Sequence, residues 1–440
     1  MRLIHRLILG ALCAAPLGAF AGSMPAAGTS AMPSAADGLH LNWIDRAASP
    51  TQNFFLYANG NWMKDNPVPP AYSSWGQFSA VHQRNLEVLR QILESAANTH
   101  AAAGSDTQKI GDFYASGMDE AAVNADGIKP LQPELDRIAA IHNRKELQAE
   151  FAHLQTIGVN ALFNFGPMQD FKDSSKVIGA ARQGGLTLPD REYYLSQNSK
   201  FTAIRTEYVQ NMSSTFVLMG EPIYDAGHDA TAVLDIETAL AQASMTREKQ
   251  RDPKAVYHIM TLKKLAKETP EFSWPSYLAE MGQSKLKSIN LSEPLFFKAM
   301  NLELIRVPLD NWKAYLRWHL VHTYAPYLSQ AYVQQDFQLQ SALSGAKELL
   351  PRWQRVINSE NRALGFAVGE AYVAKAFPPS SKQAAIAILH GVRHALNDDL
   401  ASLSWMGKKT RLAAIKKLDM MGERIGYPDK WRDYSALTID

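Results

Sequence analysis

A helical repeat of apolar residues dominates this sequence and constrains its fold more than any other feature. From Phe78 onward, Leu86, Leu89 and Leu93 recur at intervals of three and four residues, with charged residues on the opposite side. This is the pattern of an amphipathic helix with one face in a core. The same spacing predicts further helices near 110–117, 135–138, 202–219, 230–243, 313–324, 331–349, 353–373, 382–403 and 408–422.

The stretch 159–165 departs from this repeat, because its apolar and polar residues alternate as they do in a strand. No repeat of fixed period and no long heptad run is present, which argues against solenoids and coiled coils. The predicted fold class is therefore mainly α, with a large helical domain and a minor β element. A chain of 440 residues suggests two or three domains.

The N-terminus reads as a secretory signal peptide covering 1–21. Arg2 and Arg6 precede a short apolar run, which ends at the small residues Ala19 and Ala21. We expect a secreted protein, periplasmic or extracellular, with no membrane attachment after cleavage. The only cysteine, Cys13, lies inside this signal, so the mature chain would hold no disulfide and no thiolate site. The stretch 22–38, rich in Ala, Ser, Pro and Gly, is predicted to be a disordered linker.

Composition limits the classes of partner. The apolar fraction of 46% with 10% aromatics supplies a sizeable core and argues against general disorder. The formal net charge is only +2, and both arginines of the signal peptide contribute to it. Nucleic acids and anionic membranes require a clustered basic surface. We therefore expect neither as a partner.

The pair His390 and His394 is the sharpest candidate for a metal site, because residues four apart share a helix face, with Asp398 one turn further on. In an H-E-x-x-H zinc peptidase, the residue after the first histidine is the glutamate that activates the metal-bound water. Here that residue is Gly391. The pattern lacks a general base, and we interpret the pair as a solvated or hydrogen-bonded helix face.

Three further groups invite a functional interpretation. His319 and His322 have ligand spacing, but their apolar neighbours indicate hydrogen-bonded histidines at the edge of a core. Asp398 and Asp399, and likewise 190–192, could supply a proton-transferring carboxylate. However, adjacent carboxylates point to different faces of a helix, so solvated charge or helix capping is the simpler interpretation.

The aromatic stretch 75–78, together with Tyr57 and Trp62, could stack on a ligand, although aromatics at this density more often fill a core. No phosphate-binding loop, dinucleotide fingerprint or G-x-S-x-G elbow occurs in the sequence. Nucleotide binding and serine-hydrolase chemistry therefore lose support.

Longer motifs point to a family. The stretch 53–62, NFFLYANGNW, and the stretch 186–194, LTLPDREYY, resemble segments of the neprilysin-like zinc metallopeptidases, which include neprilysin, endothelin-converting enzyme and bacterial oligopeptidase O. Other blocks follow in the family's order, from near the start of the mature chain almost to its end. They lie at 73–78, 109–119, 251–262, 369–378, 403–410 and 425–429.

The resemblance implies two mainly helical domains that enclose a cavity, one thermolysin-like with the zinc and the other a lid that admits only peptides. In this chain it implies an N-terminal segment at 39–104 packing between lid and catalytic half, a helical lid at 105–365, and helices at 366–440 that lead into a catalytic domain of which only incomplete segments are present. At the position where mammalian neprilysin has a substrate-pairing arginine, this sequence has Ser74.

The family's zinc ligands, two histidines of H-E-x-x-H and a later glutamate, lie downstream of the block at 425–429. We therefore assign no catalytic residue and no metal ligand to this chain, and its substrate-binding residues are unknown. Zinc is expected in the full-length enzyme but not in these residues alone, which we predict to be inactive. Peptide substrates are the expected partners of the full-length enzyme, and the oligomeric state is left open.

Two other functions stay open. The chain could be a non-catalytic periplasmic protein that binds peptides or acts as a scaffold on the same helical fold. It could also be an unrelated helical solute-binding module, which would make the ordered blocks coincidental. The leading hypothesis is the N-terminal region of an exported zinc metalloendopeptidase.

Overall fold

The structure is a computed structural model that describes residues 40–438, and the chain divides into two units, one ending at Pro67 and the other beginning at Val68. The predicted signal peptide with Cys13, and the predicted linker, lie outside the described residues. None of the helices in the described part is long and apolar enough to cross a bilayer.

The first unit contains a 3-10 turn, η1 (Leu41–Trp43), and helix α2 (Phe54–Asp65). The side chain of Asn53 caps α2 by accepting a hydrogen bond from the Leu56 N–H. Asn61 donates its amide to the Ile44 carbonyl at 2.8 Å. Gly60 lies so close to Asp45 that an added Cβ would be 2.6 Å from the Asp45 Cβ. These contacts give Gly60 and Asn61 of the NFFLYANGNW block a structural role.

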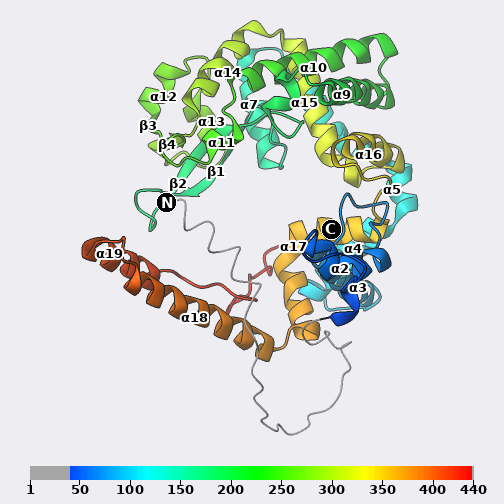
Figure 1. Cartoon of the computed structure of the whole chain (residues 1–440). Coiled ribbons are helices and arrows are strands. Elements are labelled where there is room, and N and C mark those ends of the chain that lie inside the picture. The colour runs from blue at the N-terminus through cyan, green and yellow to red at the C-terminus, as the bar shows by residue number, and fades with distance from the viewer. Residues whose placement is uncertain (1–39, 439–440) are drawn as a thin grey trace. The chain divides into compact units, whose positions relative to one another are not determined.

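The second unit has two apolar cores, and the larger one spans Leu131 to Leu339. Its helices lie together in the upper part of Figure 1. They are α6 (Gln132–Ala139), α7 (Arg144–Thr156), α8 (Arg191–Leu195), α9 (Ser199–Leu218), α10 (Ile223–Ala243), α12 (Leu262–Glu268), α13 (Trp274–Glu280), α14 (Pro294–Arg306), α15 (Leu309–Tyr324) and α16 (Gln330–Ser344). Short elements join them: α5 (Glu120–Asp126), η2 (Lys129–Leu131), α11 (Arg247–Gln250) and η3 (Ala325–Tyr327).

A four-stranded sheet in the order β1-β2-β4-β3 packs into this core. β1 (Phe163–Gln169) pairs antiparallel with β2 (Val177–Gln183), β2 pairs parallel with β4 (Ser288–Leu291), and β3 (Ile259–Thr261) is antiparallel to β4. The predicted strand at 159–165 thus begins only at Phe163. Leu162 has φ +67°, which breaks extended backbone before that residue.

The smaller core joins α3 (Gln77–Ala97), α4 (Asp106–Met118) and α17 (Arg352–Ala376), with Tyr434 from the C-terminal segment. Figure 1 shows these three helices together. α17 is kinked at Leu364, whose backbone is not helical. The sequence-based domain boundaries remain predictions. In this core α4, which lies inside the predicted lid at 105–365, packs against α3, which precedes that range, and against α17, which extends beyond it.

α18 (Pro379–Ser402) and α19 (Lys408–Asp419) follow and contact each other. No residue of α18 is buried, and Leu418 is the buried residue of α19. Large apolar side chains are therefore exposed on both helices and just after them, among them Ile388, Leu412 and Met420. The prediction of a mainly α fold with a minor sheet is confirmed.

A glycine of the 109–119 block lets α4 lie close to α3 in the smaller core, and its replacement gives a test of the packing. A Cβ on Gly111 would lie 2.6 Å from the Ala96 carbonyl oxygen of α3. We expect Gly111→Ala to lower the free energy of unfolding by about 1–3 kcal/mol, because backbone has to move. Gly227→Ala in α10, where an added Cβ meets nothing within 4 Å, should be neutral or stabilising by up to about 1 kcal/mol. Urea midpoints measure both, and equal effects would contradict the close approach.

Candidate functional site

The structure places the histidine pair of α18 beside acidic partners, and among the described residues neither histidine belongs to a group of three potential metal ligands. His390 Nε2 lies 2.9 Å from Glu423 Oε2, and Arg393 also binds Glu423. His394 Nε2 lies 3.8 Å from Asp398, and both side chains are mostly exposed. Glu423 has a pKa below its usual range because Arg393, and then His390, hydrogen-bonds to it. Each histidine thus has its own carboxylate partner.

His319 and His322 on α15 face different carboxylates. His319 Nε2 lies 3.1 Å from Glu237 Oε1 in the larger core, and His322 Nδ1 lies 2.7 Å from Asp336 Oδ1. The ring of His322 also stacks on Trp318. The two histidines therefore do not share a ligand position, although both lie at or near the core.

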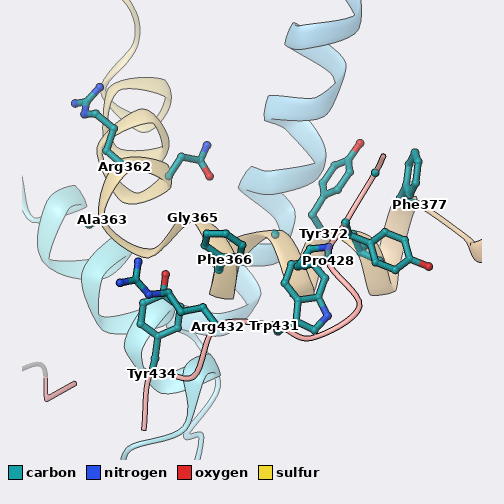
Figure 2. Close-up of a pocket in the computed structure, with 15 residues that line it drawn as sticks. Arg362, Ala363, Gly365, Phe366, Tyr372, Phe377, Pro428, Trp431, Arg432 and Tyr434 are labelled. Atoms are coloured by element: carbon teal, nitrogen blue, oxygen red, sulfur yellow. The ribbon is translucent and has the colours of Figure 1, made fainter. Parts of the chain in front are cut away.

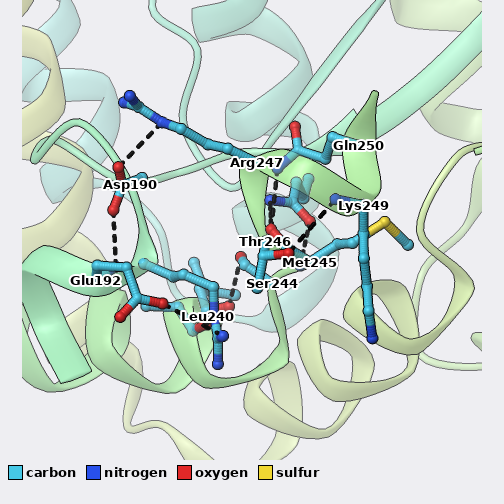
Figure 3. Close-up of polar contacts among 12 residues, drawn as sticks. Asp190, Glu192, Leu240, Ser244, Met245, Thr246, Arg247, Lys249 and Gln250 are labelled. Carbon is cyan, nitrogen blue, oxygen red and sulfur yellow. Dashed lines mark hydrogen bonds and ion pairs between the residues drawn. The ribbon is translucent and has the colours of Figure 1, made fainter. Parts of the chain in front are cut away.

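Asp190 begins helix α8 and pairs with a neighbouring loop. Its carboxylate accepts from the Glu192 N–H at 2.8 Å, and its other oxygen lies 3.0 Å from Arg247 Nε. Both contacts are dashed in Figure 3. In the same view Thr246 caps α11 by accepting from the Lys249 N–H. Asp190 therefore caps helix α8, and the 190–192 stretch has a structural role.

The aromatic stretch 75–78 lies in the second unit, whereas Tyr57 and Trp62 lie in the first. Trp75 packs edge-on against Tyr72 at 4.9 Å between ring centroids. Phe78, at the start of α3, is 93% exposed. Within the first unit, Trp62 packs against Trp43. The second unit therefore presents one aromatic ring of this stretch almost fully to the solvent.

Glu237 of α10 is a buried polar centre that sequence reasoning did not single out. It is 0% exposed and accepts hydrogen bonds from the Thr187 N–H at 3.1 Å and the Thr187 hydroxyl at 2.8 Å. The Tyr194 and Tyr208 hydroxyls donate to its other oxygen at 2.7 and 2.8 Å. Burial, and then the charge of Glu237, raises the pKa of both phenols well above their usual value.

This centre explains the LTLPDREYY block, because two of its residues, Thr187 and Tyr194, donate to one carboxylate in α10. A signal was present in the sequence. Val233, Ile236 and Leu240 form an apolar stripe at helical spacing, and Glu237 lies within that stripe. A carboxylate on the buried face of a helix requires hydrogen-bond donors from elsewhere in the fold.

Two motif blocks separated in sequence meet around a cavity of about 480 Å³. One side comes from the second half of α17 and the other from the segment at 426–434, as Figure 2 shows around Phe366, Tyr372 and Trp431. Tyr427 and Trp431 are nearly parallel, with centroids 6.0 Å apart. The lining holds aromatic and aliphatic groups with Asn361, Arg362 and Arg432, and its hydroxyl groups belong to tyrosines; it contains no histidine, carboxylate, serine or threonine. The cavity is therefore suited to holding mainly apolar groups.

A second cavity, of about 490 Å³, lies between the end of α10, α11 and the start of α14. Its charged lining combines Arg191, Lys249 and His258 with the buried Glu293. Burial raises the pKa of Glu293 above its usual value, although the Gln183 N–H donates to it at 2.8 Å. This cavity could hold a polar or anionic group.

Comparison with solved structures gives the class of protein. The inhibitor complex of zinc metalloprotease Zmp1 from Mycobacterium tuberculosis is 31% identical, with a TM-score of 0.86, and the match covers 91% of this chain and 61% of that one. PepO of Lactobacillus rhamnosis, 18% identical with a TM-score of 0.78 and covering 89% of this chain and 62% of that one, shares the fold. The chain thus has the helical architecture found in a zinc metalloprotease.

The family follows from the sequence comparison. The model of peptidase family M13 matches residues 50–428, so the chain belongs to peptidase family M13. Endothelin-converting enzyme 1 of Mus musculus is 30% identical over 414 residues, which cover 90% of this chain and 53% of the mouse protein. Neprilysin-3 of Drosophila melanogaster is 29% identical, covering 88% of this chain and 52% of the fly protein. The family predicted from the ordered blocks is confirmed, and the chain spans about half the length of these curated relatives.

Proposed function

We propose that this chain is the N-terminal region of an exported, neprilysin-like zinc metalloendopeptidase that cleaves peptides. The observation that carries the proposal is the likeness to Zmp1, a zinc metalloprotease, at 31% identity and a TM-score of 0.86 over 91% of the chain. Membership of peptidase family M13 supports the same reaction class. The apolar cavity by α17 and the polar cavity by α11 are surfaces on which a peptide or a further part of the enzyme could lie.

The 440 residues contain no H-E-x-x-H motif. That motif supplies two zinc ligands and the glutamate that activates the metal-bound water. The residues described here would therefore not hydrolyse peptides alone, and the catalytic zinc would belong to the full-length enzyme. α18 has no buried residue, and apolar side chains are exposed on α18 and α19, which supports the proposal that a further part of the enzyme packs against these helices. Export to the periplasm or the extracellular space, with peptides rather than nucleic acid as partners, is part of the proposal.

The test compares two proteins made from the same reading frame. Residues 22–440 should leave an internally quenched peptide uncut. If the reading frame continues to an H-E-x-x-H motif, the longer protein should cleave the same peptide, and a chelator should abolish that cleavage. Chelator-sensitive cleavage by residues 22–440 would contradict the predicted inactivity. A stop directly after codon 440, together with saturable peptide binding, would instead favour the non-catalytic peptide-binding protein.

A further inference from the structure

Three potential metal ligands meet between helices α6 and α7, far along the chain from the histidine pair that the sequence suggested. Glu134 comes from α6, and Glu150 and His153 from one face of α7 in a Glu-x-x-His arrangement. One ligand atom from each residue lies within 4.8 Å of the others. His153 Nε2 is already 2.6 Å from Glu134 Oε2. Residues three apart share a helix face, so α7 presents both of its donors to Glu134.

The two oxygens of Glu150 are in different situations. Oε2 accepts from Arg137 Nη2 at 3.0 Å. Oε1 is buried and has no hydrogen-bond partner among the described residues, and the residue as a whole is 4% exposed. A buried carboxylate oxygen without a donor is destabilising, because it has lost its hydrogen bonds to water and gained none in the protein. The unpartnered oxygen is therefore a second observation that points to a ligand, independent of the clustering itself.

We propose that Glu134, Glu150 and His153 bind a divalent transition-metal cation, with zinc as the best match. One imidazole nitrogen and two carboxylate oxygens form a mixed donor set that zinc accepts. The side chains of Glu134 and His153 are 23% and 29% exposed, so the ion can enter from the solvent and a water can complete its coordination. At a tetrahedral ion two ligand atoms lie about 3.3 Å apart, so the His153–Glu134 contact opens slightly on binding.

Arg137 is the competing cation, and its position also suits an orienting role. Its Nε lies 3.6 Å from Glu134 Oε2, and its Nη2 holds Glu150 Oε2. In the metal-free site it offsets part of the charge of the two carboxylates. With the ion bound, its bond to Oε2 would fix the Glu150 carboxylate while Oε1 turns to the ion, as outer-sphere partners of metal ligands commonly do.

The bound ion would join α6 to α7 within the larger core. Ile138 of α6 and Leu147, Phe151 and Leu154 of α7 are buried there. Because the ligands come from two helices, the unfolded chain offers no preformed site, and binding stabilises the folded state. This inference is independent of the proposed peptidase activity, and it departs from the expectation that the chain alone holds no metal.

The experiment measures zinc binding by residues 22–440 after dialysis against EDTA, using zinc chloride in calorimetry and metal analysis. We expect one zinc per chain, and a melting temperature raised by about 5 °C at an excess of zinc. Glu150→Gln, which keeps the shape and an oxygen acceptor for Arg137, should weaken binding at least tenfold. His153→Ala should weaken it further.

The matched control is His390→Ala, which removes the histidine beside Glu423 and should leave zinc binding unchanged. Circular dichroism and the metal-free melting temperature show whether each variant is folded. If a variant is unfolded, Glu134→Gln is used in its place. Absence of zinc binding by the folded parent would overturn the proposal. Binding that survives Glu150→Gln and His153→Ala but disappears with His390→Ala would overturn it as well, and would assign the metal to α18.

Discussion

Replacing Glu237 with alanine is expected to lower the free energy of unfolding by about 3–5 kcal/mol, the range found when one partner of a buried charged network is removed. The carboxylate accepts four hydrogen bonds, and His319 Nε2 lies 3.1 Å away. Without it, the Tyr194 and Tyr208 hydroxyls and the Thr187 amide are left buried near a cavity. Each unsatisfied donor costs about 1–3 kcal/mol unless the site rearranges.

The matched control for this variant is Asp235→Ala, because Asp235 lies on the same helix and is exposed. It should change stability by less than about 0.5 kcal/mol. Glu237→Gln should fall between the two, since its amide presents one acceptor and one donor to groups that all donate. Urea denaturation followed by circular dichroism gives the three values. If Glu237→Ala and Asp235→Ala cost the same, the centre does not hold the 186–194 block to α10.

Many of the helices were predictable because their stability comes from apolar stripes that the sequence displays directly, whereas α2, α7 and α14 lie outside the predicted ranges. α15 ends at Tyr324 as expected, and the predicted 408–422 helix corresponds to α19. α16 ends at Ser344, five residues before the predicted end, because Gly345 adopts a left-handed conformation that closes the helix. The predicted strand at 159–165 begins too early, because β1 starts only at Phe163. Val159, Ala161 and Leu162 are all fully buried although they precede the strand, so the apolar pattern at this point marked the core and not the sheet.

Contacts between distant segments were not predictable, since no local pattern encodes them. Lys109 appears in the sequence as an ordinary charged helix residue. In the structure it is 1% exposed, and its ammonium group donates to the Tyr434 carbonyl at 2.6 Å. The blocks at 369–378 and 425–429 could likewise be recognised one by one, but the cavity that they share became visible only with the fold. The candidate metal ligands on α6 and α7 depend on the same kind of long-range placement.

Glu237 and Glu360 show where sequence reasoning stops. Each glutamate lies within an apolar helical stripe, and for Glu360 the neighbours are Val356, Ile357 and Leu364 of α17. Both are 0% exposed. Glu237 is surrounded by donors, whereas neither oxygen of Glu360 has a hydrogen-bond partner in the part of the chain that the structure describes. The stripe predicts burial, but only the fold shows whether donors meet the buried carboxyl group.

The consequence for Glu360 is a pH-dependent stability. Burial raises the pKa of this carboxyl to about 8, from an ordinary value of 4.5. Tyr114 of α4 lies in the same core, with its own hydroxyl buried and unpartnered among the described residues. At neutral pH the folded protein therefore keeps Glu360 protonated, while the unfolded chain releases the proton. Its stabilising contribution is fully present below about pH 4.5 and is lost as the pH rises towards 8, at no more than about 1.4 kcal/mol per pH unit.

Glu360→Gln removes the titrating group and keeps its shape, so it isolates this effect from the other acids, which titrate in both proteins. We expect the variant to be close to the parent in stability at pH 5 and more stable by several kcal/mol at pH 8, because deprotonation no longer favours the unfolded chain. Glu370→Gln, at an exposed position of the same helix, should follow the parent at both values. Urea midpoints between pH 5 and pH 8 decide the matter. Parallel curves of stability against pH for the parent and Glu360→Gln would contradict this account. They would mean that the Glu360 carboxyl is ionised in the folded protein and has a partner. The smaller core would then have to open around α17 to provide that partner.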